Sequence, residues 1–173
     1  MFSDPLKNLK AIPVHEHHIV VDLGAGTGYY SVAAGKLASL GKVYAVDIAK
    51  DYLHTIQNKA KEAHLQNVEI IWGDVEKKNG TKLKDGLADV VIASNILFQV
   101  EDKKSFIEEI KRILKPKGKV LLVDWNSDSP LMGGRHVVGK SKAEAMFIDM
   151  VLKLQRENNT GEHHYGTILR VEK

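Results

Sequence analysis

The chain has 173 residues, a formal net charge of +3 and no cysteine, and 43% of its residues are hydrophobic. The lack of thiols excludes disulfide bonds and cysteine-ligated metal centres. Lysines scattered among acidic residues do not form the basic stripe that nucleic-acid binding requires. Length and composition are those of one globular domain, so we expect residues 1–173 to form a single unit.

The first residues lack the apolar core of a signal peptide, and no apolar run approaches the length that spans a bilayer. We therefore expect the cytoplasm and no membrane partner. Within residues 1–17, Leu6, Leu9 and Ile12 share one side of a short leader helix that Pro13 stops. This helix either forms a flap over a ligand or packs on the edge of the sheet.

Three histidines lie close together at positions 15, 17 and 18. The side chains of His17 and His18 point to opposite faces of an extended chain, and no second cluster of ligands is assigned to join them. We therefore expect no metal site.

The stretch from residue 19 to residue 30 predicts a strand, a glycine loop and the start of a helix. Its β-branched residues 19–21 favour an extended chain. Gly24, Gly26 and Gly28 let the backbone turn sharply and approach a ligand closely. Such a unit near the start of an α/β chain is typical of a nucleotide-like ligand. The apolar residues that follow at helical spacing are Val32, Ala33, Leu37 and Leu40.

The spacing of these glycines narrows the ligand class. The dinucleotide fingerprint needs its third glycine where Tyr29 stands, and no Gly-Lys-Ser/Thr follows as in a Walker A loop. An NAD-dependent oxidoreductase is therefore disfavoured. The pattern present is Asp-x-Gly-x-Gly-x-Gly, in which Asp22 stands two residues before Gly24.

Two further acids follow predicted strands. Asp47 ends the strand 42–46, about twenty residues after the glycine loop, where an acid accepts hydrogen bonds from ribose hydroxyls. The alternative for Asp47 is a helix N-cap. Asp74 follows the strand 68–72, where an acid can accept the adenine amino group, although a Gly-Asp pair alone is only a turn signal.

From there to about residue 125, predicted strands and helices continue to alternate along the chain. Strands are predicted over 88–93 and 119–124, and the segment 115–118 ends the helix between them. The alternation predicts a doubly wound α/β fold, with helices on both faces of a mostly parallel sheet and ligands at the carboxyl ends of its strands. The core face of the helix before residue 115 carries Phe106, Ile110, Ile113 and Leu114.

The last third differs in character. Residues 126–140, rich in glycine, proline, serine and aspartate, predict a mobile loop. A helix over 141–151 and two strands over 152–156 and 165–171 follow. The apolar face of this helix comprises Ala143, Phe147, Ile148 and Val151.

Three segments, 21–28, 45–47 and 114–120, carry a resemblance to a known family. They resemble the class I S-adenosyl-L-methionine-dependent methyltransferases, and among these the small ubiquinone/menaquinone-biosynthesis-type group. The resemblance runs from Val20 to about Trp125. It implies a Rossmann-like, three-layer α/β/α fold of about seven strands, the last of them antiparallel. It also implies S-adenosyl-L-methionine as cofactor and S-adenosyl-L-homocysteine as product.

The resemblance implies roles for individual residues. Asp22 would help to hold the ammonium group of the cofactor, Asp47 its ribose, and Asp74 with Val75 its adenine. The residues after the fourth strand would line the pocket near the sulfonium. The full set of implied cofactor-binding residues is Asp22, Gly24, Ala25, Gly26, Thr27, Gly28, Tyr30, Asp47, Ile48, Gly73, Asp74, Val75, Ser94, Asn95 and Ile96.

The catalytic residue stays open, because many relatives carry a histidine pair where this chain has Leu97, Phe98 and Gln99. An antiparallel last strand would begin at the ligand end of the sheet. It would bring residues 163–165 beside the substrate mouth, either as substrate contacts or as a polar hairpin tip. The candidates for a general base are His136, His163 and His164.

The expected reaction is in-line displacement of the methyl group by an unidentified acceptor, a small molecule in preference to a nucleic acid. Little of the chain is inserted between strands, so a homodimer, a partner chain, a large substrate or residues 126–140 would close the site. The alternative function is a non-catalytic subunit or sensor that binds S-adenosyl-L-methionine.

Overall fold

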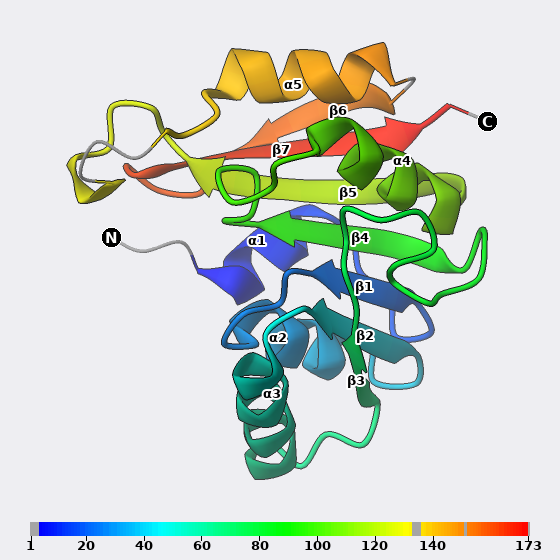
Figure 1. Cartoon of the computed structure of the whole chain (residues 1–173). Helices are drawn as coiled ribbons and strands as arrows, with labels where there is room; N and C mark the ends of the chain where they lie inside the picture. Colours follow the sequence, from blue (N-terminus) through cyan, green and yellow to red (C-terminus); the bar gives the residue numbers. More distant parts are fainter. Residues whose placement is uncertain (1–3, 133–135, 151, 173) are drawn as a thin grey trace.

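The computed structural model describes residues 4–132, 136–150 and 152–172. Figure 1 shows its strands side by side in one seven-stranded sheet. The elements in chain order are α1 (Pro5–Ala11), β1 (Ile19–Leu23), α2 (Tyr29–Leu37), β2 (Lys42–Asp47), α3 (Lys50–Glu62), β3 (Val68–Trp72), β4 (Ala88–Ser94), α4 (Lys103–Ile113), β5 (Leu114–Trp125), the 3₁₀ helix η1 (Pro130–Met132), α5 (Lys140–Asp149), β6 (Leu152–Asn158) and β7 (His164–Val171).

The strand order in the sheet is β3-β2-β1-β4-β5-β7-β6. The strands from β3 to β5 in this order run parallel, so that Val20 of β1 lies between Val43 of β2 and Val90 of β4. β7 is antiparallel to both of its neighbours, β5 and β6. The expected doubly wound sheet with an antiparallel last strand is therefore confirmed.

Helices cover both faces of the sheet, because its inner strands carry apolar side chains on both sides. In β5, Val120 and Leu122 pack on the face covered by α4 and α5. Leu121 and Val123 pack on the opposite face, with residues of α1 and α2. Figure 1 shows α5 over β6 and β7 and α3 at the far end of the sheet. The result is the expected three-layer α/β/α architecture.

The strand order reverses between β1 and β4, because β2 and β3 lie on one side of β1 and β4 and β5 on the other. Loops leaving the strands diverge at such a point and open a crevice at the carboxyl edge of the sheet. β7 begins at this edge, since His164 pairs with Trp125 at the end of β5. The fold therefore gathers the ends of five parallel strands and the start of the last one.

The leader forms α1, which begins after the N-cap Asp4 and packs beside α2. Leu9 and Ile12 are fully buried in a cluster with residues of α2 and of the central strands. The helix therefore packs on the middle of one face of the sheet, and the expectation that it packs on the sheet edge is wrong. Pro5, its first residue, also lines the cavity described below.

The helix after the glycine loop is shorter than the apolar spacing predicted. α2 ends at Leu37, and Leu40 is 64% exposed. The Gly41 amide donates to the Ala38 carbonyl oxygen at 2.9 Å and closes a turn, and a Cβ at Gly41 would collide with the carbonyl oxygen of His18. Leu40 thus lies in a turn that joins α2 to β2.

The segment 115–118 turns the chain as expected, but it does so inside a strand. Leu114 already pairs with Ala88, and pairing resumes with Lys119 beside Val90. The four residues between these pairs form a bulge in β5. Leu114 therefore belongs to the sheet and not to the last turn of α4.

In the tail, α5 packs through one narrow stripe. Ala143 and Phe147, one helical turn apart, are fully buried, whereas Ile148 is 47% exposed. Successive residues point about 100° apart around a helix, so Ile148 leaves the buried stripe. The expectation for Ile148 is therefore wrong, and Val151 lies outside the described residues.

Residues 126–140, which the sequence predicts as a mobile loop, include a short helix where they are described. Residues 130–132 form η1, and Met132 and Val138 are buried. Residues 133–135 lie outside the described residues. Lys140, which was expected to end the loop, begins α5.

Candidate active site

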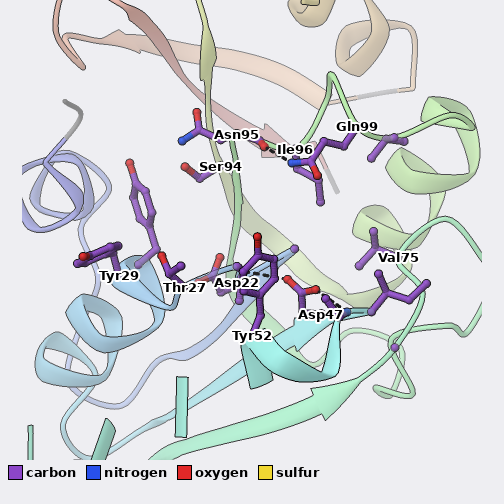
Figure 2. Close-up of a pocket in the computed structure, with 18 of the residues that line it drawn as sticks. Asp22, Thr27, Tyr29, Asp47, Tyr52, Val75, Ser94, Asn95, Ile96 and Gln99 are labelled. Carbon is purple, nitrogen blue, oxygen red and sulfur yellow. Dashed lines mark hydrogen bonds between the residues drawn. The ribbon is translucent and has the colours of Figure 1, made fainter. Parts of the chain in front are cut away.

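A cavity of about 860 Å³ opens at the carboxyl edge of the sheet. Figure 2 shows side chains that follow β1, β2 and β4 directed into it. It collects nearly all of the residues that the sequence singled out for cofactor binding. Those that line it are Asp22, Gly24, Ala25, Gly26, Thr27, Tyr30, Asp47, Ile48, Gly73, Asp74, Val75, Ser94, Asn95 and Ile96.

The glycine loop follows β1 with left-handed backbone at each glycine. A Cβ at Gly24 would collide with the Ile96 side chain. A Cβ at Gly26 would have only one atom within 4 Å, at 3.9 Å, so it would point into open space. Gly28 does not line the cavity; a Cβ there would lie 2.8 Å from Ile56 Cγ1. Gly28 therefore serves the turn into α2, and Gly26 leaves room for a ligand.

Asp47 ties the end of β2 to the glycine loop. Its Oδ2 accepts a hydrogen bond from the Gly26 amide at 2.8 Å, and its Oδ1 accepts one from the Ala49 amide at 2.8 Å. Ala49, and not Asp47, is the N-cap residue of α3, so the N-cap alternative is wrong. Each carboxylate oxygen keeps a lone pair for a hydroxyl donor in the cavity.

Replacing Asp47 by alanine is expected to weaken binding of S-adenosyl-L-homocysteine by about 1.5–3 kcal/mol, the strength of hydrogen bonds to a charged group. The domain should stay folded, and calorimetric titration measures the loss. Asp51→Ala is the matched control, because Asp51 is exposed in the first turn of α3 and does not line the cavity. Equal affinity of the two variants would mean that Asp47 only accepts the backbone hydrogen bonds of Gly26 and Ala49 and does not contact the ligand.

Asp22 lies at the floor of the cavity as a buried carboxylate. Its Oδ2 accepts a hydrogen bond of 2.6 Å from the Ser31 hydroxyl. Burial raises the pKa of Asp22 to about 7, and the charge of Asp47 adds to the rise while the Ser31 bond opposes it. A carboxylate in this position favours a cationic ligand group, because such a group offsets the cost of its burial.

The third acid, Asp74, lies beside the end of β2. The Gly73 amide donates to the Asp47 carbonyl oxygen at 3.1 Å. Asp74 Oδ1 accepts a hydrogen bond from the Glu76 amide at 3.0 Å, and Oδ2 lies 3.2 Å from Lys77 Nζ. This places Asp74 and Asp47 on the same side of the cavity.

The segment after Asp74, expected to be a plain surface loop, is fastened to α4 by a buried carboxylate. Glu109 accepts hydrogen bonds from the amides of Asn79 and Thr81 and from the Arg112 guanidinium. Although burial acts against it, hydrogen bonds from Arg112 and Thr81 lower the pKa of Glu109 to about 2. This network supports the loop that carries Asp74.

The end of the cavity near β5 and β7 carries polar atoms without partners among the described residues. They are Asn95 Oδ1 and both ring nitrogens of His164, all buried. The His164 ring stacks on Trp125, with ring centroids 4.1 Å apart. Burial, with a smaller contribution from His163, lowers the pKa of His164, so its imidazole is neutral at pH 7. Such a ring can accept or donate a proton.

Of the three histidines considered as a base, only His164 lines the cavity. His136 is exposed, and His163 Nδ1 lies 3.5 Å from Ser129 Oγ. Tyr165 is buried on the other face of the sheet, where its hydroxyl donates to the Val138 carbonyl oxygen at 3.0 Å. Side chains alternate along a strand, so Tyr165 points to the face opposite His164. His163 precedes β7 and does not line the cavity either, so the expectation that residues 163–165 lie together beside it is wrong for these two.

Other lining residues lacked a sequence signal strong enough to single them out. Trp125 ends β5, and Gln99 and Val100 lie in the loop after β4, positions that could have marked them. Pro5 comes from the leader, and only the packing of α1 brings it there. The lining residues missed by sequence reasoning are Pro5, Tyr29, Ala49, Tyr52, Glu76, Gln99, Val100 and Trp125.

The chain is similar in sequence to known methyltransferases. Residues 14–171 match the family model described as "Methyltransferase domain". The demethylmenaquinone methyltransferase of Geobacillus sp. (strain WCH70) is 29% identical over 130 residues, which make up 75% of this chain and 54% of that protein. The malonyl-acyl-carrier-protein O-methyltransferase of Halorhodospira halophila is 26% identical over 164 residues, or 85% and 54%. The chain spans about half the length of these curated relatives.

Among solved structures, the fold is similar to that of a SAM-dependent methyltransferase from Aquifex aeolicus. The TM-score is 0.87 and the sequence identity 24%, and the match covers 98% of this chain and 90% of that one. The architecture is thus that of a known fold.

Proposed function

This chain belongs to the methyltransferase domain family, and we propose that it transfers the methyl group of its cofactor, S-adenosyl-L-methionine, to a small-molecule acceptor. The observation that carries the proposal is one cavity that joins three acids and the glycine loop to a polar end without partners. The end with the acids and the glycine loop suits a charged nucleoside ligand. The polar end with Asn95 and His164 suits the methyl acceptor.

The residues present fit the cofactor chemically. Buried Asp22 favours the ammonium group, Asp47 keeps lone pairs for ribose hydroxyls, and Gly26 leaves space for close backbone approach. Asp74 is assigned to the adenine end. When bound, the cofactor supplies an electrophilic methyl group on sulfur, and the sulfur keeps the electron pair as the bond to the methyl group breaks.

The protein's part in the reaction is alignment, exclusion of water and proton transfer. Trp125 and the loop after β4 wall the polar end of the cavity. His164, neutral at pH 7, is assigned as the group that accepts the proton of an oxygen or nitrogen nucleophile at a ring nitrogen. An acceptor that attacks through a thiolate needs no such base.

The test is production of S-adenosyl-L-homocysteine from S-adenosyl-L-methionine with a panel of quinols, phenols, carboxylic acids, amines and thiols. Acceptor-dependent product supports the proposal. Tight binding of the cofactor with no turnover on any acceptor would favour the alternative, a non-catalytic subunit or sensor.

With the acceptor so identified, His164→Ala is expected to slow methyl transfer about 100-fold, the usual contribution of a general base. The affinity for S-adenosyl-L-homocysteine should change less than about threefold. His163→Ala is the matched control, because this neighbour does not line the cavity. Equal turnover of both variants would remove His164 from the proton-transfer role.

The methyl acceptor, the cellular compartment and the partner chain are the remaining parts of the proposal. The relatives named above differ in acceptor, since one name specifies demethylmenaquinone and the other malonyl-acyl-carrier protein. In the described part of the chain, no helix is long and apolar enough to cross a bilayer. We propose that residues 1–173 act as one domain in the cytoplasm, with a second copy or a partner chain closing the site.

A further inference from the structure

The loop between β4 and α4, residues 95–102, forms one wall of the cavity. Asn95, Ile96, Gln99 and Val100 all line the cavity. Asn95 has a left-handed backbone with a φ of 53°, a conformation that costs energy outside glycine. Its buried Oδ1 has no partner among the described residues. Strained residues of this kind persist where surrounding contacts hold them in place.

The contacts that hold the start of this loop come from Asp124, a fully buried residue at the end of β5. Asp124 Oδ2 accepts hydrogen bonds from the amides of Ile96 at 3.1 Å and Leu97 at 2.9 Å. Its Oδ1 accepts one from the Trp125 amide at 2.8 Å. Asp124 does not line the cavity, so its carboxylate acts on the loop and not on a ligand.

The end of the same loop is held by a second carboxylate. Glu76 Oε2 accepts hydrogen bonds from the amides of Glu101 at 2.9 Å and Asp102 at 2.7 Å. Glu76 stands two residues after Asp74 and lines the cavity itself. The loop is thus fixed at one end by β5 and at the other by the segment assigned to the adenine.

We propose that Asp124 is a positioning residue of the active site, which holds Asn95 and Ile96 at the cavity wall through the amides of Ile96 and Leu97, with Glu76 holding the other end of the loop. The inference rests on the proposed function and deepens it. A carboxylate suits the task, because its two oxygens accept from three amides at once. In an asparagine, the NH₂ group would face one of these donors, and that bond would be lost.

The test compares Asp124→Asn with Asp89→Asn, a matched variant near the opposite edge of the sheet. Asp89 also accepts a backbone hydrogen bond, from the Ile19 amide at 2.8 Å, but does not line the cavity. Three quantities are measured for each protein. They are the affinity for S-adenosyl-L-homocysteine by calorimetry, the hydrogen exchange of the Ile96, Leu97 and Trp125 amides by NMR, and the free energy of unfolding.

Asp124→Asn is expected to weaken S-adenosyl-L-homocysteine binding about tenfold and to speed exchange at least about tenfold at the amide or amides that face the new NH₂ group. Asp89→Asn should leave the affinity and the exchange of these amides unchanged. If Asp124→Asn does not fold, Asp124→Ser replaces it with the same three amides as reporters, because one hydroxyl oxygen cannot accept from all three. Unchanged exchange and affinity, or equal losses in the Asp89 variant, would overturn the inference. Failure of the wild-type protein to bind the ligand counts against the proposed function, and amide exchange then decides the positioning role.

Discussion

Gly26→Ala is expected to weaken binding of S-adenosyl-L-methionine about 100-fold or more while leaving the protein folded. The added methyl group would meet no protein atom closer than 3.9 Å, and Gly26 lines the cavity. The methyl group therefore occupies ligand space and not core space. The cost to stability is that of a left-handed alanine at a φ of 52°, about 1–2 kcal/mol.

The matched control for this variant is Gly86→Ala. Gly86 has a φ of 62° and open space around its Cβ position, but it does not line the cavity. Both variants should lower the free energy of unfolding by a similar amount, measured by denaturant titration. Only Gly26→Ala should lose affinity in calorimetric titration. Equal affinities would mean that the ligand does not approach the glycine loop.

Asp22→Asn is expected to raise the thermal stability of the ligand-free protein and to lower its affinity for S-adenosyl-L-methionine. The pKa of Asp22 is about 7 in the folded protein against 3.8 ordinarily. The folded state therefore binds the proton more tightly, and stability falls as pH rises from 3.8 to 7. At pH 8 the buried carboxylate is ionised and lowers the free energy of unfolding by its full desolvation cost. Asparagine avoids this cost, so the variant should be more stable by about 2 kcal/mol, or roughly 4–8 °C in Tm.

The pH dependence separates this explanation from a general packing effect. Between pH 8 and pH 5 the wild-type protein regains most of this cost, because folded Asp22 takes up its proton below a pKa of about 7 whereas the unfolded side chain stays ionised down to about 3.8, so the difference in Tm should shrink. Affinity of the wild-type protein should rise as pH increases through 7, because the ammonium group of the ligand binds the ionised form. The variant should bind about 30-fold to 100-fold more weakly at pH 8, with little pH dependence, while exposed Asp51→Asn should match the wild type. A variant that is less stable at pH 8 would contradict the assignment.

Local sequence signals were sufficient for the fold and for most of the cavity. The family resemblance, drawn from segments such as 21–28, is confirmed by the family match over 14–171. Strand ends in a parallel sheet meet at one edge, so acids and glycines at those ends could be placed together. Asp22, Asp47 and Asp74 line the same cavity for this reason.

The errors and omissions depend on contacts distant in sequence or on side-chain direction. His163 was grouped with His164, although it precedes β7, does not line the cavity and lies with its Nδ1 3.5 Å from Ser129 Oγ. Asp124 was assigned only to a strand, because its bonds go to a loop 27 and 28 residues earlier in the chain. Pro5 reaches the cavity only because α1 packs across the face of the sheet.

The most direct test of the account is calorimetric titration of the wild-type protein with S-adenosyl-L-methionine, S-adenosyl-L-homocysteine and NADH in parallel. We predict micromolar binding of both sulfur ligands, about −8 kcal/mol, and no binding of NADH. Absence of binding by both sulfur ligands, or binding of NADH alone, would contradict the assignment of the cavity to S-adenosyl-L-methionine.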